Sequence, residues 1–178
     1  MIHGKRINLR LVKSTDECQA FVDAYNDLSE RSATDHTEIK SFTTLKAQFS
    51  QDGLWSDQAG TLLITNKEDR VIGSISFSRL SPFELEIGYR LLKQADHGKG
   101  YVSEALSLFS AYLFATKPIH RLRIQTASSN IGSQKVAEKC SFQREGILRQ
   151  AYFYRGKMCD YLIYGLLRDA CKPLTFTP

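Results

Sequence analysis

The sequence predicts a mixed α/β domain of the α+β type, built on one sheet flanked by helices. The chain has 178 residues, of which 42% are hydrophobic, a size and composition that suit one domain over residues 1–178. Several short segments alternate apolar and polar residues, as half-buried strands do, and others repeat apolar residues at helical spacing. Their order is a strand, two helices, three antiparallel strands, a helix, a strand, a helix and a hairpin.

The first third of the chain predicts a strand and two helices. Residues 7–11 alternate as a short strand. Ser14 and Glu17 then have the spacing of a capping box, in which both side chains satisfy free amides at the start of a helix. A second helix is expected over residues 45–49, within a weakly patterned stretch from residue 30 to residue 55.

The remaining segments alternate between strand and helix patterns. Residues 61–65 and 71–78 predict a hairpin around the turn-forming "NKEDR". After them we expect a strand at 85–91, a helix at 102–113, a strand at 122–126 and a helix at 133–140. The last two strands, 142–153 and 158–167, form a hairpin with Gly156 in its turn.

Charge and cysteine content narrow the function. The net charge of +5 favours an anionic ligand or partner. The charges are scattered, and Arg121 and Arg123 alternate along a predicted strand, which indicates a solvated strand face rather than a nucleic-acid site. No pair of the four cysteines is spaced C-x-x-C, so we expect reduced thiols and no metal. No apolar run suits a membrane span or a signal peptide, and we expect a cytoplasmic protein.

The stretch "HGKGYVSEA", from His97 to Ala105, has the chemistry of an anion site. Amides at the start of a helix have no internal partner, the helix dipole adds positive potential, and Lys99 adds a full charge. The stretch lacks the Lys-Ser/Thr pair of a P-loop and the third glycine of a dinucleotide fingerprint. A plain turn before a helix is the alternative.

Two longer runs, "EIGYRLLKQADHGKGYVSEAL" and "RLRIQTASSNIGSQKVAEKCSFQREG", resemble the GNAT N-acetyltransferase superfamily. The resemblance is closest to its RimJ/RimL-like branch, which acetylates the N-termini of ribosomal proteins. It covers residues 71–167, and the opening "INLRLVKSTDE" is also similar to that branch. It implies a mostly antiparallel sheet with one splayed strand pair. It also implies transfer of an acetyl group from acetyl-CoA to a primary amine by direct attack in a ternary complex.

The resemblance also implies which residues hold the cofactor. The pyrophosphate loop of the family, [QR]-x-x-G-x-[GA], falls on residues 97–102, with His97 and Val102 departing from it. The pattern N-x-x-S-x-x-[VLA]-x-x-x-G-F falls on Asn130 and Ser133, with Ser141 in place of the glycine. Asn130 would otherwise only cap a helix. The expected cofactor-binding residues are Tyr89, Arg90, Leu91, His97, Gly98, Lys99, Gly100, Tyr101, Val102, Ser103, Asn130 and Ser133.

Catalysis needs a base for the ammonium proton and a donor for the leaving thiolate. We expect Glu86 to be the base, and the resemblance implies that Ser133 lies near the sulfur as the donor. Glu84 shares the face of Glu86, and both could instead be surface partners of lysines. Tyr152 and Tyr154, with Glu84, are expected to line the acceptor groove, although the tyrosines could simply pack. Residues 30–55 are expected to form a wall of it. The carboxylate that some members carry after "EG" has no counterpart in "ILRQAYFY".

The acceptor has more than one candidate. A basic enzyme suits the N-terminal α-amine of an acidic ribosomal protein, whereas a polyamine or an aminoglycoside would favour an acidic groove. A third possibility is an acyl-CoA-binding module without catalysis. The chain is expected to be a monomer or a homodimer.

Overall fold

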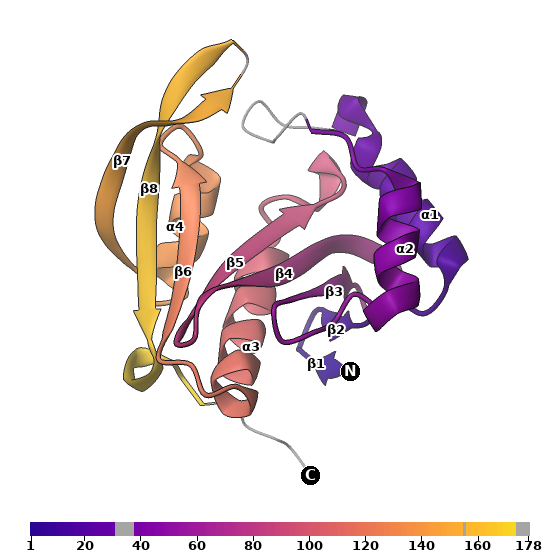
Figure 1. Cartoon of the computed structure of the whole chain (residues 1–178), viewed down its shortest axis with the longest axis horizontal. Helices are drawn as coiled ribbons and strands as arrows, with labels where there is room; N and C mark the ends of the chain where they lie inside the picture. The colour runs from indigo at the N-terminus through magenta and orange to yellow at the C-terminus, as the bar shows by residue number, and fades with distance from the viewer. Residues whose placement is uncertain (31–37, 155, 174–178) are drawn as a thin grey trace.

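One sheet forms the centre of the protein, in a computed structural model that describes residues 1–30, 38–154 and 156–173 (Figure 1). Its strand order is β1-β2-β3-β4-β5-β6-β8-β7. The strands are β1 (Ile2–His3), β2 (Asn8–Arg10), β3 (Ala59–Thr65), β4 (Val71–Ser81), β5 (Glu84–Leu91), β6 (Arg121–Ala127), β7 (Gln143–Tyr154) and β8 (Lys157–Leu167). The α-helices in the described chain are α1 (Thr15–Asn26), α2 (Phe42–Asp52), α3 (Tyr101–Thr116) and α4 (Ile131–Lys139).

The expected elements occur in the expected order. Strand β1 was not expected, because two residues carry no periodic signal. Helix α2 extends beyond the predicted 45–49 at both ends, because Ser41 caps its start and Gly53 ends it in a left-handed conformation with φ 65°. Part of the weakly patterned stretch, residues 31–37, lies outside the described residues, as does Arg155 in the last turn. No helix in the described ranges has the length and apolar character to cross a membrane.

The sheet is antiparallel except where β5 meets β6. That parallel pairing joins Glu84 to Arg121, Leu85 to Leu122 and Glu86 to Arg123, and then it ends. Beyond Glu86 the strand β5 stays paired with β4 as far as Leu91, while β6 stays paired with β8 as far as Ala127. The two strands therefore diverge, and the splayed pair that the resemblance implied is confirmed (Figure 1).

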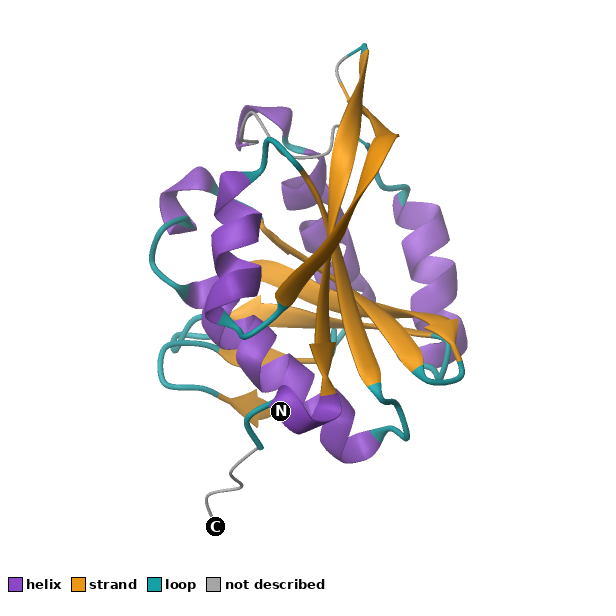
Figure 2. Ribbon diagram, turned by 90° about the vertical axis from the view of Figure 1, so that its left-hand side faces the viewer, coloured by secondary structure: helices purple, strands orange, loops and turns teal. Residues whose placement is uncertain are grey.

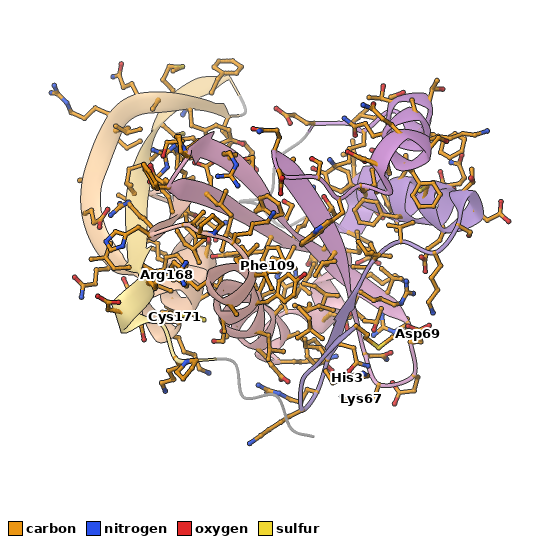
Figure 3. The ribbon with its side chains drawn as sticks, turned by 60° about the horizontal axis from the view of Figure 1, so that its bottom comes forward. His3, Lys67, Asp69, Phe109, Arg168 and Cys171 are labelled. Carbon is orange, nitrogen blue, oxygen red and sulfur yellow. The ribbon has the colours of Figure 1, made fainter. Side chains whose placement is uncertain are left out.

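Helices cover the two faces of the sheet unequally. Helices α3 and α4 pack on one face, where Phe109 of α3 lies among buried residues of β4, β5, β6 and β8 (Figures 2 and 3). Helices α1 and α2 pack on the other face through a smaller cluster that includes Phe21 and Leu63. Leu85 and Ile87 of β5 belong to the first face. Glu84 and Glu86 alternate with these two residues along β5, so they point to the opposite face.

Arg168 holds the C-terminal end of α3 (Figure 3). Its guanidinium donates to the carbonyls of Phe114, Lys117 and Ile119, and it also stacks on the Phe114 ring. The Phe114 carbonyl lies in the last turn of α3 and has no partner within the helix, and a cation there also suits the helix dipole. Helix α3 is therefore fixed at one end, while its other end begins at the glycine loop.

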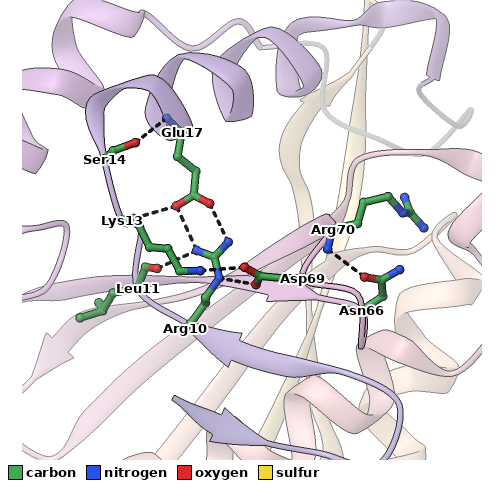
Figure 4. A network of polar contacts seen from close by, with 8 residues as sticks. All are labelled: Arg10, Leu11, Lys13, Ser14, Glu17, Asn66, Asp69 and Arg70. Atoms are coloured by element: carbon green, nitrogen blue, oxygen red, sulfur yellow. Dashed lines mark hydrogen bonds and ion pairs between the residues drawn. The ribbon is translucent and has the colours of Figure 1, made fainter.

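A buried arginine joins β2, α1 and the β3–β4 turn (Figure 4). Arg10 is 5% exposed and donates to both carboxylate oxygens of Glu17 and to Asp69. Glu17 also accepts from the Lys13 amide, while its own amide donates to the Ser14 hydroxyl. The capping residue Ser14 and its partner Glu17 are thus where the sequence predicted them, and Glu17 additionally neutralises a buried cation.

This network predicts a stability loss in acid. The hydrogen bond from Arg10 holds the pKa of Glu17 below its ordinary value. Because the folded pKa is lower than the unfolded one, the stabilisation is present above about pH 4.3 and disappears as the pH falls through the folded pKa. Glu17→Gln should lower the free energy of unfolding by roughly 1–3 kcal/mol at pH 7. The free energy of unfolding of this variant should also depend less on pH below about pH 4.3, as chemical denaturation at a series of pH values would measure.

Asp16→Asn is the matched control for this prediction, because Asp16 lies in the same first turn of α1 and is exposed. It should keep the acid dependence of the unmodified protein. An equal loss of pH dependence in both variants would contradict the role given to the Arg10–Glu17 pair.

Candidate active site

The glycine loop between β5 and α3 presents a row of unused amides. Gly98 and Gly100 have φ of 74° and 77°, a left-handed conformation that glycine adopts without strain, and Gly100 caps α3. The backbone amides of residues 98–103 have no hydrogen-bond acceptor within the described parts of the chain. Amides and a helix dipole converging at one point form an anion site.

A buried carboxylate anchors the loop. Asp96 is 2% exposed and accepts two hydrogen bonds of 3.0 Å from the Arg70 guanidinium. This pairing, which outweighs the effect of burial, holds the pKa of Asp96 below its ordinary value. The Lys99 ammonium lies 3.6 Å from the same carboxylate. The loop is therefore held through side chains and not through its own amides.

Arg6 clamps the loop from the N-terminal side. Its guanidinium donates to the Lys99 carbonyl at 2.8 Å, and its Nε and backbone amide each donate at 3.0 Å to the Glu104 carboxylate. Glu104 lies in the first turn of α3, where its charge would repel an anion held by the loop. Arg6 neutralises that charge.

Several cations line a cavity beside this loop. A cavity of about 430 Å³ is lined by Lys5, Arg6, Asn66, Lys67, Glu68, Lys99 and Tyr101. Lys67 reaches this region from the β3–β4 turn and lies near the N-terminal strands (Figure 3). A second cavity, of about 1210 Å³, runs beside α3 and shares Arg6, Ser103 and Glu104 with the surroundings of the loop. Part of the net positive charge is therefore concentrated around an array of amides, which suits a polyanionic ligand.

Tyr89 and Ser133 meet across the gap between the diverging strands. The Tyr89 hydroxyl lies 2.9 Å from Ser133 Oγ and 3.2 Å from the Ser133 carbonyl. Burial raises the pKa of Tyr89 to about 12, so the phenol stays neutral. Asn130 caps α4 by accepting the Ser133 amide at 3.0 Å, and its own amide NH2 has no acceptor among the described residues. The partner that a serine on the apolar face of α4 requires is thus Tyr89.

Ion pairs cover the opposite face of β5 and β6, which we name the charged face (Glu84, Glu86, Arg121, Arg123 and Glu145). Arg121 contacts Glu84 at 3.0 Å and also contacts Glu145. Arg123 contacts Glu86 at 3.1 Å through two nitrogens, both on Oε2. Oε1 of Glu86 therefore has no partner in the described parts of the chain. The partners of the two glutamates are arginines, which corrects the lysines considered from the sequence.

Three tyrosines stack beside the charged face on the β7–β8 hairpin. The Tyr152 ring lies 4.8 Å from Tyr161 and 5.9 Å from Tyr154, both nearly parallel. Burial, with smaller contributions from Tyr152, Glu86 and Glu38, raises the pKa of Tyr161 to about 12. The stack therefore lies close to both carboxylates.

The structure sorts the predicted site residues into three places. The loop residues His97 to Ser103 gather at the start of α3, and Tyr89, Asn130 and Ser133 gather at the start of α4. Glu84 and Glu86 lie on the charged face, with Tyr152 and Tyr154 beside it. The Arg90 side chain lies away from the loop, stacked 4.3 Å above the Tyr25 ring. It can therefore meet a ligand in the splay only through its backbone.

Sequence reasoning missed the supporting residues Arg6, Arg70, Asp96 and Tyr161. It also missed that Arg121 and Arg123 pair with the glutamates. One signal was present for the arginines. Two glutamates and two arginines, each two residues apart, stand in strands that lie side by side, so their side chains align in register.

Comparisons with known proteins give the family of this chain. The family model of the acetyltransferase (GNAT) domain matches residues 6–143. "Probable N-acetyltransferase YjcK" of Bacillus subtilis is 28% identical over 94% of this chain and 97% of its own length. "Ribosomal-protein-serine acetyltransferase" of Escherichia coli is 34% identical over 58% of this chain and 59% of its own.

Solved structures share the fold. RimL, a ribosomal-protein α-N-acetyltransferase solved with coenzyme A, superposes with a TM-score of 0.79 at 22% identity, covering 94% of this chain and 97% of that one. A spermidine N-acetyltransferase from Vibrio cholerae, solved with CoA and spermine, gives 0.80 at 16% identity, covering 94% and 98%. The chain belongs to the GNAT acetyltransferase family, and its reaction is acetyl-CoA-dependent N-acetylation.

Proposed function

We propose that this enzyme acetylates the N-terminal α-amine of a protein. The observation that carries the proposal is the charge balance around the charged face. On it, three carboxylates (Glu84, Glu86 and Glu145) stand with two arginines (Arg121 and Arg123), so the net charge is −1. One net negative charge suits a single ammonium group, whereas a polyamine carries several positive charges and would favour a larger excess of carboxylates. A peptide carries one N-terminal amine and many backbone N–H and C=O groups. These groups suit a surface on which arginine donors and carboxylate acceptors alternate.

The geometry of the loop and the splay supports an assignment of the cofactor residues. The amides of residues 98–103, with His97 and Lys99 beside them, hold the pyrophosphate of acetyl-CoA. The pantetheine arm runs along residues 89–91, whose edge toward β6 lacks a strand partner. The free amide NH2 of Asn130 would donate to the same ligand. The acetyl group then lies where the strands diverge, between Ser133 on one face and Glu86 on the other.

The reaction needs a neutral amine close to the thioester carbonyl. Glu86 takes the ammonium proton on Oε1, directly or through water, while Arg123 keeps Oε2 in place. The amine nitrogen forms a bond to the carbonyl carbon, and an amide of the unpaired edge of β5 stabilises the oxyanion. The carbon–sulfur bond then breaks, its electron pair leaves with sulfur as a thiolate next to Ser133, and the attacking nitrogen loses its second proton to water. Holding both reactants in place supplies most of the acceleration.

The experiment is thiol release from acetyl-CoA against a panel of amines. The panel contains acidic and basic peptides with free N-termini, the same peptides with blocked N-termini, spermidine and an aminoglycoside. We expect turnover on peptides with a free N-terminus and none on the blocked ones. Faster turnover on spermidine than on any peptide would overturn the assignment of the acceptor. Binding of acetyl-CoA without transfer to any amine would favour the acyl-CoA-binding module.

A further inference from the structure

We propose that Tyr89 is a positioning residue that directs the Ser133 hydroxyl toward the leaving sulfur. The inference rests on the proposed placement of the thioester beside Ser133. It concerns the side chain of Tyr89, whereas the cofactor arm uses the backbone of the same strand.

The contacts of Tyr89 allow only two arrangements of two protons. In the first, the tyrosine donates to the Ser133 carbonyl at 3.2 Å and the serine donates to the tyrosine oxygen at 2.9 Å. The serine proton is then used within the protein. In the second, the tyrosine donates to Ser133 Oγ at 2.9 Å, and the serine proton is free to point elsewhere.

A thiolate selects the second arrangement. An anion beside Ser133 attracts the serine proton, and Tyr89 then supplies the hydrogen bond that Ser133 Oγ accepts. Hydrogen bonds in a chain polarise one another, so the serine becomes a stronger donor than it would be alone. The proton stays on the serine, because a thiol is a stronger acid than a hydroxyl, and the thiolate is protonated later from solvent.

Burial keeps Tyr89 in the required state. Its pKa of about 12 lies well above the ordinary pKa of a thiol, about 8.5, so the thiolate does not deprotonate it. Tyr89 therefore remains a donor wherever the enzyme works. The hydroxyl pair also joins β5 to α4 across the splay, which fixes the serine relative to the cofactor strand.

The test measures the thiol of bound CoA, without an acceptor amine. The thiolate absorbs in the ultraviolet, and a pH titration of the complex gives the pKa of the bound thiol. Tyr89→Phe should raise that pKa by at least ~0.5 unit and leave the affinity for desulfo-CoA, which has no sulfur, unchanged. Tyr164→Phe is the matched control. Tyr164 is a buried tyrosine that donates to Glu138 of the same helix, and its loss should leave the thiol pKa unchanged.

Kinetics add a second test on any amine that the enzyme acetylates. Ser133→Ala should lower kcat at least ~10-fold, Tyr89→Phe by less, and the double variant should match Ser133→Ala within ~2-fold, because Tyr89 acts only through Ser133. An unchanged thiol pKa in Tyr89→Phe, or equal losses of affinity for CoA and desulfo-CoA, would show a structural role and overturn the inference. A shifted thiol pKa together with no turnover on peptides would instead overturn the proposed acceptor and leave this inference standing.

Discussion

Replacing Glu86 by glutamine is expected to lower kcat at least ~100-fold while leaving the affinity for acetyl-CoA within ~2-fold of that of the unmodified enzyme. Glutamine has the shape of glutamate and can still accept from Arg123, so the local structure should persist. It cannot take a proton from the acceptor ammonium. The measurements are steady-state kinetics on the best peptide acceptor and calorimetric binding of acetyl-CoA.

Glu84→Gln is the matched control, because Glu84 is the neighbouring carboxylate on the same face and also pairs with an arginine. It lies where β5 and β6 are still joined, one step further from the gap. We expect its kcat to stay within ~3-fold of that of the unmodified enzyme. Full activity in Glu86→Gln, or equal losses in both variants, would remove Glu86 as the base.

Gly100→Ala is expected to weaken acetyl-CoA binding at least ~100-fold, the loss of about 3 kcal/mol of binding free energy. Gly100 has φ 77°, and a Cβ there would lie 3.0 Å from the guanidinium nitrogens of Arg6. Relief of either the backbone strain or the contact moves the amides that follow, or detaches the clamp on Lys99 and Glu104. Isothermal titration with acetyl-CoA measures the effect.

Substitutions at two other glycines serve as controls, because they distinguish the effect of backbone strain from a change in the geometry of the site. Gly156, in the β7–β8 turn, has φ 81° with nothing within 4 Å of an added Cβ. Gly156→Ala should cost a similar backbone strain, about 1 kcal/mol of stability, and leave acetyl-CoA affinity unchanged. Gly98 has φ 74° and equally open space, so Gly98→Ala should weaken binding less than Gly100→Ala. Unchanged affinity in Gly100→Ala would refute the loop as the pyrophosphate site.

Local patterns predicted the fold well because the determinants were short-range. Ser14 and Glu17 marked the start of α1, and the alternation of β4 and β5 placed both strands. One departure from the family pattern also has a local explanation. Ser141 stands where the family pattern has glycine, and it has φ 67°, which explains why glycine is favoured there.

The supporting shell of the site could not be predicted in this way. Arg6 reaches Lys99 and Glu104 across more than ninety residues, and Arg70 reaches Asp96 from another strand end. Nothing in the local sequence distinguishes these arginines from exposed ones, because only the tertiary fold brings their partners near. The same holds for Tyr89, whose hydroxyl partner comes from α4.

The divergence of β5 from β6 also determines how the two parts of the sheet are joined. Three residue pairs join an antiparallel block of five strands to a separate block of three. The core under α3 also joins the two blocks, and backbone amides at the margins of each block exchange with solvent more readily than those at its centre. A ligand whose amides pair along residues 89–91 would act as an additional strand between the blocks. The cosubstrate would thus extend the backbone pairing between the two blocks, and release of CoA would expose the edge of β5 again.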